Sequence, residues 1–356
     1  MKILLCTGIF PPDIGGPATY SKLLKDELPK RGFEVNVLSF GEVRKFPKII
    51  RHIVYFFKVL KRGSGVDVVY AQDPVSVGLP SVLAAKILNK KFIIRVAGDF
   101  AWEQGVQRFG VKETIDDFQN KKYGLFVNFF KKIQKFVVDK ADTVITPSIY
   151  FKNLVSGWCM DPKKVITIYN GIKLIDRSIN TKKENMIVTA GRLVSWKGFD
   201  VLIELMKDLP EWSLSIVGDG PDHDKLRSLI EENGLSGRVF LKGSISREDL
   251  MDLLLRSKLF ILNTSFESFS FQVVEAMFAG IPVITTNIGN LKEIIENNKE
   301  GILVEPNNKT QILNAIQKIN SDENFRREIV VNAKKKSEFF SIEYTVENLI
   351  NVLINL

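Results

Sequence analysis

The chain has 356 residues, 45% of them hydrophobic, which is long for a single core and predicts two domains. With only two cysteines and two histidines, it can form neither a disulfide framework nor a histidine-built zinc site. No stretch approaches the roughly 20 apolar residues of a membrane span, and residues 1–10 are too short for a secretory signal. We therefore expect a cytoplasmic protein.

The net charge of +9 is unevenly distributed. Residues 1–170 carry 27 lysines and arginines against 15 acidic residues, a net charge of +12, so the remaining residues carry −3. A basic first half joined to a nearly neutral second half indicates that one half faces an anionic partner.

Short apolar runs alternate with helical patterns through the first half. We predict helices from about 20 to 31 and 75 to 88, strands at 2–7, 35–39, 66–70 and 92–96, and a strand and turn at 141–148. This alternation is typical of a parallel sheet covered by helices on both faces. Ligands of such sheets bind at the carboxyl ends of the strands, where Gly15, Asp73 and Asp99 fall.

The loop after the first strand carries Gly15 and Gly16. Glycines at this place let the backbone approach a phosphate closely, although the loop lacks the G-x-G-x-x-G spacing of a dinucleotide site. A plain tight turn is the alternative. Asp99 also has two interpretations, a site residue or the cap of the next helix.

Two segments, 44–62 and 121–140, are basic and amphipathic. In the second, Lys131, Lys132 and Lys135 interrupt a broad set of phenylalanines and valines. A basic helix with exposed aromatic side chains fits an anionic bilayer surface. The alternative is that the aromatic side chains are core and the lysines are simply solvated.

The second half opens, after a polar linker at 173–184, with a strand at 186–190 and the string GRLVSWKG. Arg192 and Lys197 lie between two glycines where the strand meets a helix. An arginine can bind two phosphate oxygens while a lysine adds a point charge, so the pair favours a diphosphate. The alternative is a pair of surface cations. The next strand, at 213–217, ends in a turn at Gly218.

The string FESFSFQVVEAMFAGIPVITT, residues 266–286, contains Glu267 in a loop and Glu275 inside the following helix. A carboxylate beside a phosphate site is suited to bind a sugar diol, because it accepts two hydrogen bonds. Alternatively, Glu267 is a surface residue and Glu275 interacts with the helix dipole.

The helix between these glutamates begins in the sequence SFSF. Ser268 or Ser270 can cap it, and Gly280 can end it. The free N–H groups at such a helix start bind anions, phosphate above all. We expect those groups to belong to Phe269, Ser270 and Phe271.

The E-x7-E string and the G-R-L-x-x-x-K-G string resemble the signatures of the retaining nucleotide-sugar glycosyltransferases of the GT4 family, which have the GT-B fold. The resemblance covers almost the whole chain and is most specific from Gly191 to Pro306. It implies an α/β protein of two facing Rossmann-like domains with a cleft between them. The implied domains are an acceptor domain at 1–172, a nucleotide-sugar domain at 185–338, and a helix at 339–356 that packs back on the first.

The resemblance also implies roles for the motif residues. Glu267 would hold the donor sugar near its reacting carbon, Glu275 would bind the ribose, and Arg192 and Lys197 would neutralise the diphosphate. Relatives carry a His-Gly pair after the fourth strand, but this chain has Ala97-Gly98, which leaves Asp99 as the nearest polar candidate for catalysis. The remaining implied donor contacts are Gly15, Gly16, Gly218, Ser268, Phe269, Ser270 and Phe271.

The implied activity is retaining transfer of a hexose from a UDP- or GDP-sugar to a hydroxyl acceptor, with neither metal nor cofactor. A lipid-linked or cell-envelope glycan, as in polysaccharide or lipopolysaccharide biosynthesis, would place the protein at the inner face of the membrane. Two alternatives stay open: a GT-B relative with other chemistry, such as a nucleotide-sugar epimerase, and a non-catalytic basic protein that binds membrane or nucleic acid. Nucleic acid is disfavoured, because no base-reading motif accompanies the charge.

Overall fold

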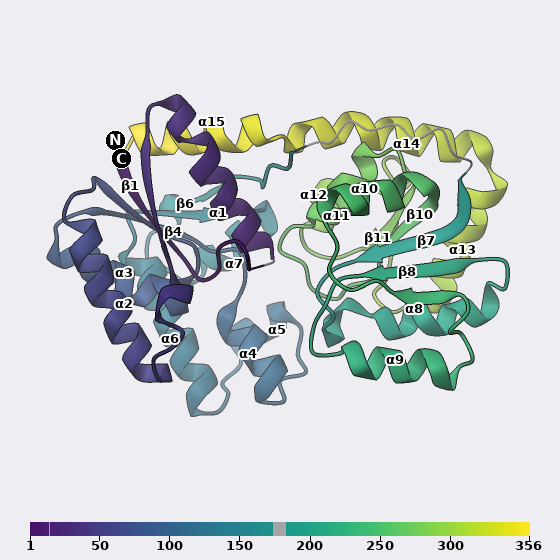
Figure 1. The fold of residues 1–356 in the computed structure, drawn as a ribbon, viewed down its shortest axis with the longest axis horizontal. Coiled ribbons are helices and arrows are strands. Elements are labelled where there is room, and N and C mark those ends of the chain that lie inside the picture. Colours follow the sequence, from purple (N-terminus) through teal and green to yellow (C-terminus); the bar gives the residue numbers. More distant parts are fainter. Residues whose placement is uncertain (14, 174–182) are drawn as a thin grey trace. The chain divides into compact units, whose positions relative to one another are not determined.

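The computed structural model describes residues 1–13, 15–173 and 183–356, so most of the predicted linker at 173–184 lies outside the described residues. The chain forms two compact units, one of residues 1–171 with 342–356 and the other of residues 172–341. Each is built on a six-stranded parallel sheet with helices on both faces, which confirms the predicted α/β class (Figure 1).

The sheet of the first unit has the order β2-β1-β3-β4-β5-β6. Because neighbours lie on opposite sides of β1 and β3, the strand order reverses between these two, which is where ligands of such sheets bind. The predicted strands are confirmed to within a few residues. The observed strands are β1 Lys2–Thr7, β2 Glu34–Ser39, β3 Val68–Ala71, β4 Lys91–Arg95 and β5 Thr143–Thr146, together with β6 Val165–Thr167, which was not predicted.

Helices α1 (Gly16–Glu27) and α15 (Ile342–Ile354) cover one face of this sheet, where Leu349 packs into the same core as Ile3 (Figure 1). On the other face, Gly63 at the end of α2 lies against Leu4 of β1. The helices that follow along the chain are α2 Lys48–Gly63, α3 Leu79–Ile87, α4 Phe100–Arg108, α5 Ile115–Asn120, α6 Leu125–Lys140 and α7 Ile149–Ser156.

Helix α1 begins at Gly16, four residues before the predicted start. Pro17 fits the first turn, where its missing N–H costs nothing, so the helix extends back to the glycines. The short helices α5 and α7 were not predicted, since neither is long enough to show a clear period.

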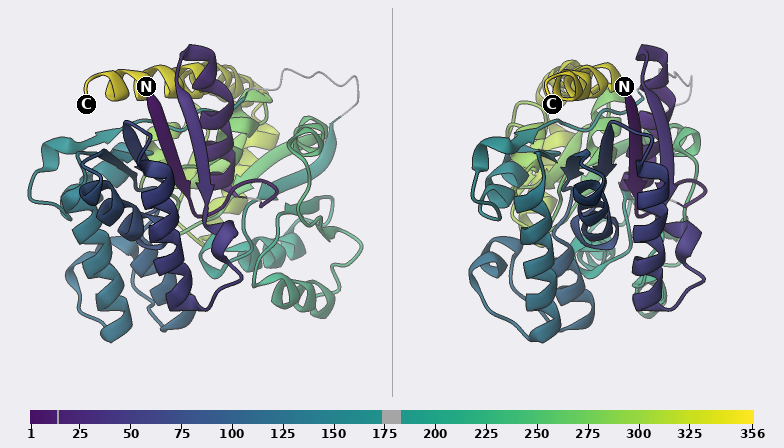
Figure 2. Two further views of the ribbon diagram at one scale, coloured as in Figure 1. Left: turned by 60° about the vertical axis from the view of Figure 1, so that its left-hand side comes forward. Right: turned by 90° about the vertical axis from the view of Figure 1, so that its left-hand side faces the viewer.

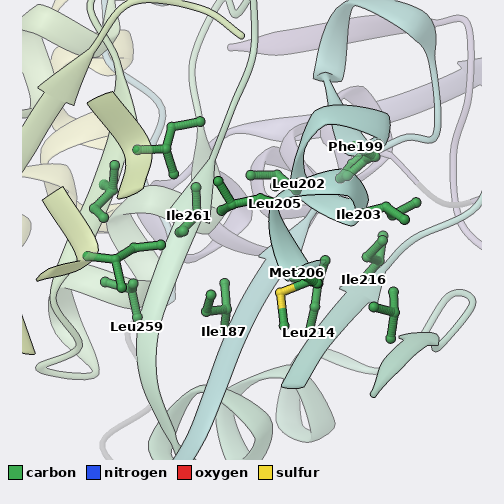
Figure 3. Close-up of a cluster of buried hydrophobic side chains, with 14 of the residues drawn as sticks. Ile187, Phe199, Leu202, Ile203, Leu205, Met206, Leu214, Ile216, Leu259 and Ile261 are labelled. Carbon is green, nitrogen blue, oxygen red and sulfur yellow. The ribbon is translucent and has the colours of Figure 1, made fainter. Parts of the chain in front are cut away.

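The sheet of the second unit has the order β12-β11-β10-β7-β8-β9, which reverses between β7 and β10. Ile187, Leu259 and Ile261 of its strands pack against α8 in a continuous hydrophobic core (Figure 3). The strands are β7 Glu184–Ala190, β8 Ser213–Val217, β9 Val239–Leu241, β10 Ser257–Leu262, β11 Val283–Thr286 and β12 Ile302–Val304. The helices are α8 Phe199–Leu205, α9 His223–Glu232, α10 Arg247–Arg256, α11 Phe271–Phe278, α12 Leu291–Ile294, α13 Lys309–Ser321 and α14 Glu323–Ser337.

Candidate active site

The loops after β7 and β10 meet where the strand order of the second sheet reverses. The Ser265 amide donates to the Trp196 carbonyl at 2.8 Å, and the Asn263 side-chain amide donates to the Gly198 carbonyl at 3.0 Å. Gly198 has a φ of +54°, and a Cβ there would overlap the Asn263 side chain. Only glycine fits, so this end of the GRLVSWKG string is locked to the loop that carries Glu267.

This arrangement brings together two residues that the sequence analysis assigned to the donor. Lys197 Nζ lies 2.5 Å from Glu267 Oε2, and their side chains are only 10% and 13% exposed. The lysine follows β7 and the glutamate follows β10, so the ion pair bridges the reversal point. A desolvated pair of this kind is a preformed electrostatic centre rather than a surface salt bridge.

Arg192 and Gly218 lie at the neighbouring strand ends. Gly218 has a φ of +131°, and a Cβ there would overlap the Gly191 carbonyl oxygen, so the loops after β7 and β8 are in direct backbone contact. The Leu193 amide donates to the Asp219 carbonyl at 3.0 Å. Arg192 itself is exposed and does not join the Lys197 ion pair.

Ser270, not Ser268, caps α11: its hydroxyl accepts from the Val273 amide at 3.3 Å. The first backbone hydrogen bond of this helix runs from the Val274 amide to the Ser270 carbonyl. The N–H groups of Phe271 and Gln272 come before it and have no acceptor within the helix. Of the predicted amides, Phe271 lies in the first turn, whereas Phe269 lies before the cap with a buried side chain. Gln272 was missed, because the prediction set the helix start too early.

Glu275 lies in the second turn of α11 and is 6% exposed. Arg247, the first residue of α10, donates to Glu275 Oε1 from Nε at 2.8 Å and from Nη2 at 2.5 Å. Burial raises the pKa of Glu275, and the Arg247 charge opposes that rise. The sequence analysis missed Arg247. The sequence did contain an indication of its role. A cation in the first turn of a helix lies unfavourably close to the positive end of the helix dipole, so its presence there implies another interaction.

In the first unit, Gly15 and Gly16 lie at the start of α1. Gly15 has a φ of +149°, and a Cβ there would come within 3.0 Å of Ile9 Cδ1. Asp73, after β3, accepts from the amides of Val75 and Ser76 at 3.0 and 2.6 Å and so caps the turn that follows it. Both groups lie at the carboxyl ends of β1 and β3, where this sheet reverses.

Asp99 is fully buried and caps α4 by accepting from the Trp102 amide at 3.0 Å. The side-chain amides of Gln119 and Gln134 donate to its two oxygens at 2.8 and 2.9 Å. Burial raises its pKa, and these hydrogen bonds oppose the rise. Of its two interpretations, the structure gives Asp99 the cap, and three protein donors occupy the carboxylate.

Helices α2, α3 and α6 cover the face of the first sheet opposite α1 (Figure 2), and they carry a set of exposed apolar side chains that we call the apolar face. It comprises Ile49, Ile50, Ile53 and Phe57 of α2, Leu83 and Ile87 of α3, and Leu125, Phe126, Phe129 and Phe136 of α6. Lys132 and Lys135 of α6 are exposed, as expected, but Lys131 is not. It is 9% exposed and donates to the carbonyls of Phe118, Gln119 and Lys121. Both interpretations of this segment, bilayer-facing and solvated, required an exposed Lys131 and were wrong about this residue.

Two family models match the chain. Residues 14–175 match Glycosyltransferase Family 4, and residues 171–336 match Glycosyl transferases group 1. An uncharacterized glycosyltransferase of Methanocaldococcus jannaschii is 25% identical over 97% of this chain and 96% of its own length.

Solved structures show the same fold over whole chains. Sucrose-phosphate synthase from Thermosynechococcus elongatus superposes with a TM-score of 0.82 at 19% identity, covering 99% of this chain and 98% of its own. A crystal structure of Anabaena HepE in complex with UDP-glucose gives a TM-score of 0.78 at 19% identity, with 100% of both chains covered. The predicted GT-B fold is confirmed.

Proposed function

The chain belongs to the GT4-like glycosyltransferases, and we propose that it transfers a hexose from a nucleoside-diphosphate sugar to a hydroxyl acceptor with retention of configuration. The observation that carries this proposal is the buried Lys197–Glu267 pair at the reversal of the second sheet. Ligands of such sheets bind at that point, and the pair supplies both a cation for a phosphate and a carboxylate for a sugar.

In the proposed mechanism the departing nucleotide is stabilised by fixed positive groups. Lys197 and Arg192 neutralise the charge of the diphosphate, and the N–H groups of Phe271 and Gln272 contribute the positive end of the α11 dipole. Glu267 holds the donor sugar near its reacting carbon, and Glu275 accepts hydrogen bonds from the ribose hydroxyls.

The glycines and Asp99 have supporting parts in this proposal. Gly15 and Gly16 leave room for a phosphate to approach the backbone of their own loop, and Gly218 does the same for the nucleotide near the base. Asp99 is a positioning residue that holds the start of α4, because its oxygens already accept hydrogen bonds from Trp102, Gln119 and Gln134. No catalytic contact is assigned to it.

We propose that the reaction needs no metal, because built-in cations supply the positive charge. Among the described residues, no group of three or more histidine, cysteine, aspartate or glutamate side chains is placed to hold a metal ion. Transfer activity is expected to survive EDTA. A loss of activity that magnesium or manganese restores would contradict this part of the proposal.

Labelled-product assays across a panel of UDP- and GDP-sugars, each with and without lipid-linked and soluble glycan acceptors, test the proposal. We expect a UDP-sugar to serve, in line with the UDP-glucose held by the HepE structure. Product that forms only with acceptor supports transfer. A changed nucleotide sugar without acceptor would support the epimerase alternative, and no donor turnover at all would contradict both.

The acceptor is proposed to lie at an anionic bilayer surface. Helix α6, which carries part of the apolar face, and the loop before it also expose Lys122, Lys132 and Lys135. Apolar side chains that enter the headgroup region and cations that attract anionic lipid together give reversible attachment. No helix in the described ranges is long and apolar enough to span a membrane. A lipid-linked glycan would meet the enzyme there.

A further inference from the structure

We infer that Arg247 is a positioning residue for the nucleotide: it keeps Glu275 ionised and turns one carboxylate oxygen toward the ribose. This inference rests on the proposed function, because it takes Glu275 as the ribose-binding group. Arg247 lies outside both sequence motifs and on a different helix from Glu275.

The first argument is geometric. Arg247 donates from both Nε and Nη2 to the same oxygen of Glu275, Oε1. In the described part of the chain, Oε2 accepts no hydrogen bond, so one oxygen is held while the other stays available. A bidentate contact to both oxygens would instead leave neither oxygen free of the arginine. The observed contact fixes the orientation of Glu275 and leaves an acceptor for a ribose hydroxyl.

The second argument is electrostatic. A glutamate that is 6% exposed is costly to ionise, and burial raises its pKa. The ionised form is the stronger hydrogen-bond acceptor at Oε2, whereas protonation would add an O–H donor, so a neutral Glu275 would bind the ribose hydroxyls less well. Arg247 is the charged group that lowers this pKa. It therefore preserves the form of Glu275 that the ribose needs.

In the part of the chain that the structure describes, the other elements packed against α11 supply no second charge that lowers the pKa of Glu275. Strand β11 carries no charged residue, and Lys258 of β10 donates to Asn185. On α14, Lys334 lies over the ring of Phe278, one turn beyond Glu275. Arg247 is itself held, because its Nη2 also donates to the Lys173 carbonyl at 3.2 Å.

The experiment titrates the full-length protein with UDP and with GDP between pH 5.5 and 8.5, for wild type and variants. We expect Arg247→Gln to weaken binding about tenfold at pH 7, the equivalent of one pKa unit, and Arg247→Lys to retain an intermediate affinity. Arg256→Gln, which changes an exposed arginine on the same helix, is the matched control and should bind as wild type does.

The pH dependence separates positioning from folding. Without Arg247 the Glu275 pKa rises further, so the variant should lose affinity, as pH falls, at a higher pH than wild type. Dividing variant by wild-type affinity at each pH removes the titration of the diphosphate, which is common to both. In a Glu275→Gln background the Arg247 effect and its pH dependence should both disappear.

The outcomes distinguish the inference from the function on which it rests. If wild type binds neither nucleotide, the proposed function fails and the inference with it. If wild type binds but Arg247→Gln binds equally well at every pH, the inference alone is overturned. A loss that is the same at every pH and persists in the Glu275→Gln background would show a structural role instead, and would also overturn it.

Discussion

The two sheets have the same six-stranded parallel architecture and present different chemistry at equivalent places. In the second unit, the loops after two strands carry the buried pair of Lys197 with Glu267, and two neighbouring helices carry Arg247 paired with the buried Glu275. In the first unit, the carboxylates at the strand ends, Asp73 and Asp99, cap the segments that follow them. The second unit therefore has charged groups in place for a ligand, whereas the carboxylates of the first unit are occupied by hydrogen bonds within the protein.

This difference indicates that, in a two-substrate reaction, the two units can bind different substrates through different chemistry. The nucleotide part of a donor has one fixed structure, so rigid charged groups can match it. Groups that are already in place do not have to reorganise during the reaction. The first unit carries its distinctive surface on helices, in the apolar face of α2, α3 and α6. The proposed donor and acceptor functions depend on these two kinds of surface.

The largest expected effect comes from removing the cation of the buried pair. Lys197→Ala should lower the transfer rate at saturating donor by a factor equivalent to about 2–4 kcal/mol, as loss of a fixed electrostatic donor does. Arg192→Ala should have a smaller effect, because Arg192 is exposed. Lys225→Ala, at an exposed lysine of the same unit, is the control. Wild-type rates in both Lys197→Ala and Arg192→Ala would refute the diphosphate role.

The next effect should appear in stability, at the carboxylate of the first unit. Asp99→Ala leaves the amides of Gln119 and Gln134 buried without their acceptor and removes a helix cap, which should cost about 3 kcal/mol of unfolding free energy. Asp116→Ala, at an exposed carboxylate, should cost much less. Denaturant unfolding of the two variants measures this. An Asp99→Ala protein as stable as wild type but inactive would restore a catalytic role.

Much of this fold could be predicted because most of its strands are short, apolar and largely buried. The predicted strands agree with the structure to within a few residues, since burial on both faces gives near-continuous apolar runs. Helix starts were less reliable: α1 begins earlier than predicted at Gly16, because proline in a first turn can equally be taken for a loop residue.

Long-range pairing was the part that the sequence could not supply. Lys197 and Glu267 were both selected, but not as partners, and Arg247 was missed because its partner lies 28 residues away on another helix. Lys131 was misassigned for a related reason. A helical period separates faces, but it does not show that a lysine on the inner face will find three carbonyl acceptors.

The two glutamates of the second unit should separate by function. Glu275→Gln should weaken UDP or GDP binding, because a free nucleoside diphosphate already contains the ribose. Glu267→Gln should mainly slow turnover, because its proposed partner is the sugar. We expect each main effect to be about 2 kcal/mol, the range of a hydrogen bond to a charged group. Calorimetric titration and initial rates check this, and an equal loss of nucleotide affinity in both variants would contradict the division of roles.

The smallest effect per residue is expected on the apolar face of the first unit. Each lysine near an anionic leaflet contributes roughly 1 kcal/mol, so Lys132→Glu with Lys135→Glu should reduce co-sedimentation with anionic vesicles several-fold without unfolding the protein. Wild-type binding should weaken with salt and be weak on neutral vesicles. Phe126→Ser with Phe129→Ser tests the apolar part, because both side chains are more than half exposed.

Two control variants show whether vesicle binding depends on the apolar face of the first unit. Lys225→Glu with Lys335→Glu makes the same charge change on exposed lysines of the second unit, so unchanged binding there would locate the attachment on the first unit. Lys131→Glu should instead destabilise the fold, because it would place a carboxylate against the carbonyls that Lys131 now binds. If wild type ignores anionic vesicles at low salt, the bilayer proposal fails. The acceptor is then better sought among soluble glycans, and the apolar face would call for a protein partner.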